Sequence, residues 1–357
     1  MRLVFIGLSL SSSWGNGHAT TYRALLRGLA ARGHDLLFLE RDQPWYANAR
    51  DLAAPDFCRL TLYGSEAELA DHAAEIEAAD AVIVGSYVHE GPGVIAWLAG
   101  LRRRGALCFY DIDTPVTLRA LAAGGAAYLQ PAQIPLFDVY FSFTGGPTLR
   151  FLERHYGARR AEALYCAVDA DAYRPTGAAR RWSLGYLGTY SADRQPTLER
   201  LLLEPASRLP DQRFAVVGPQ YPDTIAWPAN VERIDHLGPA DHPDFYGACA
   251  WTLNVTRADM VEAGWSPSVR LFEATACGTP IVSDVWAGME EVLTPGVELL
   301  QARGASDVLA ALARPEAERQ AIGEAGRART LRQHTGARRA AELEQCLAGL
   351  WETAEAR

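Results

Sequence analysis

A helix followed by a buried strand is predicted by residues 262–284, which read EAGWSPSVRLFEATACGTPIVSD. Ser266 suits the position before a helix, and Pro267 suits the first helical position. Gly278 and Pro280 end the helix before the apolar strand begins. The same alternation of helical periods and short apolar runs continues along the chain, and it is typical of parallel sheets covered by helices. We therefore expect an α/β fold.

Two domains are expected, because the chain has 357 residues and a polar segment, YRPTGAARR, occupies residues 173–181. Before this segment, strands are expected at residues 2–10, 35–40, 59–62, 81–87, 106–111, 139–143 and 164–168, with helices at 20–31 and 147–156 among them. After it, strands are expected at 183–188, 213–217, 251–255 and 280–285, with helices at 197–208 and 269–277. This order predicts two Rossmann-like domains facing a cleft, at 1–172 and 173–335, followed by a helix at 336–357.

The composition excludes several classes of protein. The chain contains no lysine, so its 34 basic residues are all arginine, and its net charge is −9. Enzymes that place a lysine at the reacting atoms, such as Schiff-base aldolases, pyridoxal enzymes and P-loop phosphotransferases, are therefore excluded. The acidic charge argues against a nucleic-acid partner. The six cysteines form no CxxC pair, and neither a transmembrane segment nor a signal peptide is expected, which indicates a cytoplasmic protein.

A glycine-rich loop, WGNGHAT at residues 14–20, follows the first expected strand. Gly15 and Gly17 fit two positions of a dinucleotide-binding fingerprint, and Glu40 lies where its ribose-binding acid is found. An NAD-dependent oxidoreductase is therefore one hypothesis. In another hypothesis, Gly17 offers a backbone amide to a substrate that donates a group, and His18 accepts a hydroxyl proton near neutral pH. A plain turn between strand and helix is the third interpretation.

Arg270 and Glu273 are unexpected residues for the helix that contains them. The helix dipole disfavours a cation in the first turn by up to about 1 kcal/mol, and a bound diphosphate would explain Arg270. Glu273 interrupts an apolar run, and a buried carboxylate needs hydrogen-bond donors, which two ribose hydroxyls would supply. The alternative is that the two side chains, three residues apart, pair on one helix face.

These segments together resemble the GT-B glycosyltransferases over nearly the whole chain. Residues 270–280 resemble the nucleotide-sugar signature of that family, and their Arg-x-Phe-Glu form is most similar to the spore maturation CgeB branch. Residues 165–175, YCAVDADAYRP, resemble the interdomain strand and linker, and residues 187–194, LGTYSADR, resemble the first strand and loop of the donor domain. The last helix resembles the one that crosses back onto the first domain.

The resemblance implies roles for five residues of the second domain. Gly188 would lie in the donor-binding loop, and Arg194 would stabilise the leaving diphosphate. Arg270 and the Ser268 amide would assist Arg194, and Glu273 would bind the ribose. No metal ion or other cofactor is implied, because GT-B enzymes stabilise the leaving phosphate with arginines and helix dipoles.

Asp113 of the first domain belongs to the sequence DID at residues 111–113, which could be mistaken for a metal-binding pair. Because no metal is implied, we expect Asp113 to face the sugar or the acceptor. In the second domain, Thr189 stands where many relatives have an arginine, and Trp265 stands where relatives with two glutamates have the first. Glu262 could substitute for that glutamate from an extended loop.

The function expected is a metal-independent glycosyltransferase of the hexosyltransferase type. It would move a sugar from a nucleotide-diphosphate sugar to an unidentified acceptor, such as a small molecule, a glycan or a protein. A non-catalytic nucleotide-sugar-binding protein of the same fold remains an alternative, beside the oxidoreductase. The stereochemistry is open: with His18 as general base the reaction inverts, and with the leaving phosphate as base it retains.

Overall fold

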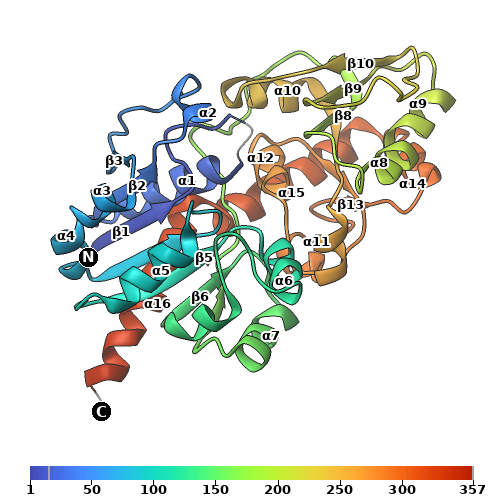
Figure 1. Cartoon of the computed structure of the whole chain (residues 1–357). Helices are drawn as coiled ribbons and strands as arrows, with labels where there is room; N and C mark the ends of the chain where they lie inside the picture. The colour runs from blue at the N-terminus through green and yellow to red at the C-terminus, as the bar shows by residue number, and fades with distance from the viewer. Residues whose placement is uncertain (15–16, 356–357) are drawn as a thin grey trace. The chain divides into compact units, whose positions relative to one another are not determined.

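Two compact α/β units make up the chain in this computed structural model, which describes residues 1–14 and 17–355 (Figure 1). Unit 1 comprises Met1–Ala167 and Gly336–Arg357, and unit 2 comprises Val168–Thr335. Each unit contains a sheet whose strands pair in parallel, and helices cover it. The expected α/β class with two Rossmann-like domains is therefore confirmed. Gly15 of the glycine-rich loop lies outside the described residues.

The sheet of unit 1 has seven strands in the described part of the chain, in the order β3-β2-β1-β4-β5-β6-β7. They are β1 (Arg2–Gly7), β2 (Asp35–Arg41), β3 (Arg59–Tyr63), β4 (Ala81–Gly85), β5 (Ala106–Asp111), β6 (Val139–Ser142) and β7 (Ala161–Ala163). The helices are α1 (Gly17–Ala31), α2 (Pro44–Ala47), α3 (Glu66–Ala70), α4 (Ala73–Glu77), α5 (Gly91–Gly100), α6 (Thr114–Ala122), η1 (Pro131–Leu136), α7 (Pro147–Tyr156) and α16 (Gly336–Glu355). Strand order reverses between β1 and β4, and sheets of this kind bind ligands beyond the carboxyl ends of the strands at such a switch point.

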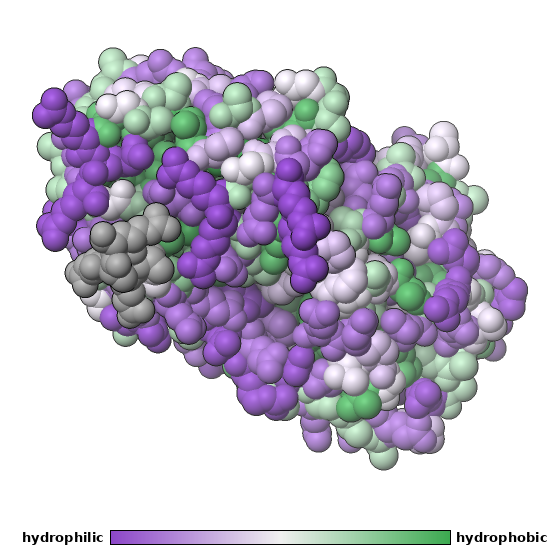
Figure 2. All heavy atoms as spheres, turned by 90° about the horizontal axis from the view of Figure 1, so that it is seen from below, coloured by the Kyte–Doolittle hydropathy of each residue, from purple (hydrophilic) through white to green (hydrophobic). Residues whose placement is uncertain are grey.

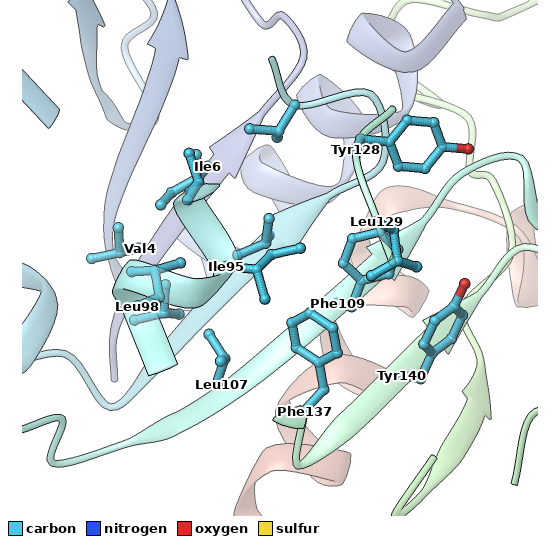
Figure 3. Close-up of a cluster of buried hydrophobic side chains, with 14 of the residues drawn as sticks. Val4, Ile6, Ile95, Leu98, Leu107, Phe109, Tyr128, Leu129, Phe137 and Tyr140 are labelled. Atoms are coloured by element: carbon cyan, nitrogen blue, oxygen red, sulfur yellow. The ribbon is translucent and has the colours of Figure 1, made fainter. Parts of the chain in front are cut away.

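One face of the unit 1 sheet carries a large apolar cluster. Val4 of β1 lies in it beside Leu98 of α5, and Tyr128 and Tyr140 lie toward the other end of the cluster (Figure 3). Apolar residues on both faces of a parallel strand are expected when helices cover both faces. Burial of these side chains stabilises the sheet of unit 1, and the candidate residues of this unit follow the carboxyl ends of its strands.

The opposite face of the unit 1 sheet is covered by α1 and α16. Phe5 of β1 meets Tyr22 of α1 edge-on, with ring centroids 6.4 Å apart. The two helices pack against each other along their lengths. A Cβ atom on Gly28 would lie 2.5 Å from the carbonyl oxygen of Gly336, so glycine permits this close approach.

The sheet of unit 2 has six strands in the part of the chain that is described, in the order β10-β9-β8-β11-β12-β13. They are β8 (Trp182–Leu187), β9 (Phe214–Val217), β10 (Val231–Ile234), β11 (Cys249–Asn254), β12 (Ile281–Ser283) and β13 (Leu300–Gln301). The helices are α8 (Gln195–Leu198), η2 (Glu199–Leu203), α9 (Glu204–Arg208), η3 (Pro239–Asp241), α10 (His242–Ala248), α11 (Ala258–Ala263), α12 (Val269–Ala276), α13 (Met289–Val292), α14 (Ala305–Leu312) and α15 (Glu316–Gln333). The switch point of this sheet lies between β8 and β11.

Two expected elements differ from the structure. The strand predicted at residues 164–168 is wrong, because the pairing of β7 with β6 ends at Ala163. The following apolar residues are buried as an extended segment that leaves the sheet, and Val168 forms an isolated bridge with Thr335. The helix predicted at 197–208 contains a π-helical turn, η2, between α8 and α9.

No helix among residues 1–14 and 17–355 is both long enough and apolar enough to cross a bilayer. Hydrophilic residues predominate on the face seen in Figure 2, where hydrophobic residues form small separate groups.

Candidate functional site

Three side chains that are distant in sequence meet at the switch point of unit 1. His18 lies in the first turn of α1 after β1, Tyr87 follows β4, and Asp113 follows β5. Nε2 of His18 lies 3.8 Å from Oδ2 of Asp113. The Tyr87 hydroxyl donates a hydrogen bond of 3.1 Å to the same Oδ2. Residues that follow three neighbouring strands thus meet at the carboxyl edge of this sheet.

Tyr87 has a strained backbone, with φ of 63° in the left-handed region. Such a conformation costs free energy for a bulky residue and often marks a functional position. The Tyr87 ring meets the His18 ring edge-on at 5.2 Å and packs against the Tyr128 ring at 4.5 Å between centroids. Burial and the charge of Asp113 raise the pKa of Tyr87, so its hydroxyl keeps the proton that it donates to Asp113.

Asp111, the first residue of the DID segment, accepts a hydrogen bond of 3.3 Å from the backbone N–H of Asp113. Its carboxylate is fully buried and accepts hydrogen bonds from the Tyr140 hydroxyl at 2.6 Å and from the Thr117 hydroxyl at 2.7 Å. Both carboxylate oxygens of Asp111 therefore accept hydrogen bonds, and a bound cation would need these oxygens as ligands. The described residues contain no group of three or more potential metal ligands.

Asp111 gives a pH-dependent prediction. Burial raises its pKa from 3.8 to about 6, so the folded chain binds this proton more tightly than the unfolded chain. The resulting stabilisation is present below about pH 4 and is lost as the pH rises through about 6. We expect the stability of Asp111→Asn relative to wild type to increase by about 2–3 kcal/mol between pH 4 and pH 7.5, at about 1.4 kcal/mol per pKa unit. Urea unfolding at both pH values measures this change, and a constant difference would contradict it.

Glu40 holds the loop that follows β1. Its fully buried carboxylate accepts hydrogen bonds from the backbone N–H groups of Leu10, at 2.7 Å, and Ser11, at 2.9 Å. The hydroxyls of Ser9 and Ser11 add bonds of 3.2 and 2.6 Å. These four donors fill the accepting capacity of a carboxylate. The interpretation of Glu40 as the ribose-binding acid of a dinucleotide site is therefore wrong.

Three arginines gather at the switch point of unit 2. Arg194 follows β8, Arg257 follows β11, and Arg270 lies in the first turn of α12. Burial lowers the pKa of Arg194, and the charges of Arg270 and Arg257 lower it further. Within the described part of the chain, the buried Nε atoms of Arg194 and Arg257 have no hydrogen-bond acceptor. Each unsatisfied donor costs about 1–3 kcal/mol, so the cluster suits an anionic ligand that supplies acceptors.

Neighbouring residues fix the position of Arg270. Its Nε donates to the Leu187 carbonyl oxygen at 2.5 Å, and its Nη1 donates to Oδ1 of Asn254 at 3.0 Å. Its guanidinium carbon lies 4.8 Å from the centroid of the Tyr186 ring. A Cβ atom on Gly188 would lie 2.7 Å from Nη2 of Arg270, so this glycine leaves room for the guanidinium.

Ser268 lies directly before α12 and shares a partner with Arg270. Its hydroxyl donates a hydrogen bond of 2.8 Å to Oδ1 of Asn254. Arg194 is held from the other side of the cluster, where its Nη2 donates to the Thr189 carbonyl oxygen at 2.7 Å. The structure therefore brings together Gly188, Arg194, Ser268 and Arg270, four of the residues predicted to bind the donor.

Glu273 lies one turn after Arg270 on α12, with 5% of the residue exposed. Its Oε2 accepts a hydrogen bond of 3.2 Å from the Tyr246 hydroxyl. Burial and the charge of Glu273 raise the pKa values of Tyr246 and Tyr173. The alternative pairing of Glu273 with Arg270 is wrong, because no ion pair joins them in the described structure and Arg270 bonds to Leu187 and Asn254. A carboxylate has about four accepting positions, so the hydroxyls of Tyr246 and Tyr173 leave some of them on Glu273.

Trp265 lies in a packed turn after α11, and the placement of Glu262 differs from expectation. Trp265 has φ of 44°, and its indole N–H donates to Glu291 at 2.8 Å. A Cβ atom on Gly288 would lie 2.4 Å from the Trp265 ring, so this side chain is packed tightly. Glu262 is exposed on helix α11, not on an extended loop.

Three residues of these clusters escaped the sequence analysis. Arg257 belongs to no motif, but a basic residue directly after a central strand could have indicated it. Tyr87 and Tyr246 carry no such signal, because tyrosines of this kind are more often core residues. Their roles follow from contacts made between separate segments.

The carboxy-terminal half of the chain is similar to a known family. Residues 194–345 match the family described as Glycosyl transferase-like. No curated protein in the comparison has significant sequence similarity to the chain.

Solved structures of similar fold cover the whole chain. Sucrose-phosphate synthase from Thermosynechococcus elongatus gives a TM-score of 0.75 at 15% identity, over 99% of this chain and 100% of that one. Alr3699/HepE from Anabaena, in complex with UDP and glucose, gives 0.71 at 14% identity, over 98% and 100%. AviGT4, a glycosyltransferase involved in avilamycin A biosynthesis, gives 0.62 at 15% identity, over 98% of both chains. The fold is therefore that of the GT-B glycosyltransferases, and the CgeB branch stays a prediction.

Proposed function

We propose that this protein is a glycosyltransferase that moves a sugar from a nucleoside diphosphate sugar to a hydroxyl group of an acceptor. The observation that carries the proposal is the cluster of Arg194, Arg257 and Arg270, which includes two buried Nε atoms without acceptors among the described residues. A diphosphate supplies both the negative charge and the oxygen acceptors that this cluster needs. The match of residues 194–345 to the Glycosyl transferase-like family supports the same assignment.

Unit 2 would bind the donor through its diphosphate and its ribose. Arg194 and Arg257 would contact the phosphate oxygens, while Arg270 and the backbone amide of Ser268 would assist them. Glu273 would accept hydrogen bonds from the ribose hydroxyls with the positions that Tyr246 leaves open. Alr3699/HepE has been solved with UDP-glucose, and this supports a uridine donor here.

Unit 1 would supply the general base. His18 would take the proton of the acceptor hydroxyl, and Asp113 would stabilise the imidazolium. The Tyr87 hydroxyl would hold Asp113 in position through the hydrogen bond that it donates. The acceptor oxygen would then form its bond to the anomeric carbon as the bond from that carbon to the diphosphate oxygen breaks. The electron pair leaves with the diphosphate, where arginines stabilise the charge without a metal ion. This sequence inverts the configuration at the anomeric carbon.

The experiment that tests the proposal is a donor screen. The protein is incubated with UDP-, GDP-, dTDP- and ADP-sugars, with water or an added sugar as the acceptor. The nucleoside diphosphate that is released when the sugar is transferred is then measured. We expect release from one donor class, with an inverted product. Release from none, together with tight binding of a nucleoside diphosphate, would instead favour a non-catalytic binding protein. A product of retained configuration would remove the base role of His18.

Glu273→Ala is expected to weaken the binding of the nucleoside diphosphate by about 1.5–3 kcal/mol, because two hydrogen bonds to a charged carboxylate are lost. Calorimetric titration of UDP measures this effect. Glu291→Ala is the matched control, because Glu291 bonds to the Trp265 indole and not to the arginine cluster. An unchanged affinity in Glu273→Ala would remove this residue from the nucleotide site.

A further inference from the structure

A polar cavity lies in unit 2, away from the arginine cluster described above. It has a volume of about 530 Å³. Its walls include Arg180 before β8, Gly247 before β11 and the Gly278–Pro280 turn before β12. These segments lie at the amino ends of parallel strands, so the cavity is at the sheet edge opposite to Arg194 and Arg270. Its volume is within the range of small-molecule sites, about 300–1,000 Å³.

Three arginines from two segments of the chain line this cavity. Arg180 belongs to the segment before β8, whereas Arg319 and Arg327 lie on α15. Nη1 of Arg180 donates to the Gly247 carbonyl oxygen at 2.9 Å, and Nε of Arg327 donates to the Ala276 carbonyl oxygen at 3.1 Å. Nη1 of Arg180 also donates to the Cys249 carbonyl oxygen. These bonds hold two guanidinium groups in place at the wall of the cavity.

Arg319 is the least satisfied of the three. Its side chain is 16% exposed, and its Nη2 pairs with Glu316 at 3.1 Å. Its Nε is buried and has no acceptor in the described structure. The charge of Arg319 also acts on Arg180, whose pKa is lowered first by burial and then by this neighbour. Two guanidinium groups therefore repel each other beside an unsatisfied donor, and an anion between them would relieve both costs.

The remaining polar lining indicates what else the ligand carries. Glu324 is the one carboxylate among the described residues that line the cavity, and Gln320 lines it as well. Nε2 of Gln320 donates a hydrogen bond of 3.3 Å to Glu316, and the amide has a second N–H and an oxygen with which to bind a ligand. A carboxylate and an amide are side chains that bind hydroxyl groups, since together they accept and donate hydrogen bonds. Guanidinium groups bind phosphate through paired N–H donors. Side chains that bind phosphate and side chains that bind hydroxyl groups therefore line the same cavity.

We propose that this cavity binds a small phosphorylated sugar, with the phosphate at Arg180, Arg319 and Arg327 and the hydroxyls at Gln320 and Glu324. The site is separate from the proposed donor site and does not depend on it. Both its charge and its hydroxyl-binding groups come from residues that have no part in the proposed transfer reaction.

The test is calorimetric titration of glucose 6-phosphate into wild type, Arg319→Gln and Arg314→Ala at low ionic strength. We expect saturable binding to wild type that is about ten- to a hundredfold weaker in Arg319→Gln, because a charged hydrogen-bond partner is lost. Arg314 pairs with Glu318 outside the cavity, so Arg314→Ala controls for the loss of one positive charge. Unchanged melting temperatures show that the variants are folded.

A fourth protein, Arg194→Ala, separates this cavity from the donor site. Its affinity for glucose 6-phosphate is expected to equal that of wild type, and glucose without phosphate is expected not to bind. Loss of binding in Arg194→Ala with retention in Arg319→Gln would assign the phosphate to the donor site and overturn the proposal. Absence of saturable binding to wild type, or equal binding of glucose, would overturn it as well.

Discussion

Arg194→Ala is expected to lower kcat for release of nucleoside diphosphate by about 100- to 1,000-fold, the range found when a preorganised electrostatic contact to a developing charge is removed. The guanidinium of Arg194 is held by the Thr189 carbonyl oxygen, and its buried Nε has no acceptor among the described residues. It is therefore fixed in place before the donor binds. The charge that forms on the leaving diphosphate is greatest in the transition state, so kcat should fall more than donor affinity.

Two variants control for this result. Arg200→Ala removes an exposed arginine that contacts Thr197 from the same segment of unit 2, and it should keep wild-type turnover. Arg257→Ala should lower kcat as well, because Arg257 belongs to the same cluster. Turnover of Arg194→Ala within a fewfold of wild type, with intact folding, would contradict the role of this cluster in stabilising the leaving group.

His18→Ala is expected to lower kcat by about 100- to 10,000-fold, the range of a general base, while leaving donor affinity unchanged. The reason is the position of Nε2, 3.8 Å from the Asp113 carboxylate that would stabilise the imidazolium. Turnover is measured with the donor and acceptor identified in the screen, or as donor hydrolysis, in which water replaces the acceptor. Tyr87→Phe should produce a smaller loss in the same direction, because it removes the hydrogen bond to Asp113 and keeps the ring.

His155→Ala is the control for His18→Ala, since His155 is exposed on α7. If His18→Ala retains wild-type kcat, the leaving phosphate and not His18 accepts the proton. The product of wild type would then be expected to have retained configuration. The kcat of His18→Ala and the configuration of the wild-type product are therefore two independent tests of the same mechanism.

The sequence predicts much of the fold because its elements carry local signals. Pro147 begins α7 and Gly278 follows α12 close to where their residue types indicate, and the long apolar runs become buried parallel strands. The strand prediction at 164–168 is wrong because an apolar run indicates burial and not strand pairing. The π-helical turn at Glu199–Leu203 could not be predicted, because no residue type marks an extra residue in a helix.

The same difference between local and non-local signals separates the site residues that could be predicted from those that could not. Arg270 and Glu273 could be identified because each conflicts with its own helix, and such conflicts are local. Arg257, Tyr87 and Tyr246 could not, because their partners come from other segments. Glu40 shows the converse error. Its spacing from the glycine-rich loop fits the dinucleotide fingerprint, but four donors from residues 9–11, which precede that loop, fill its carboxylate.

The most direct test of the central claim is a thermal-shift measurement with UDP, GDP, dTDP, ADP and NAD on wild type and Arg270→Ala. A ligand that binds only the folded state at a hundred times its Kd adds about 2.7 kcal/mol of stability. We predict that one nucleoside diphosphate raises the Tm of wild type and that Arg270→Ala loses most of this shift. Stabilisation by NAD alone, or a nucleotide shift that Arg270→Ala fully retains, would contradict a nucleoside diphosphate site at the arginine cluster of unit 2.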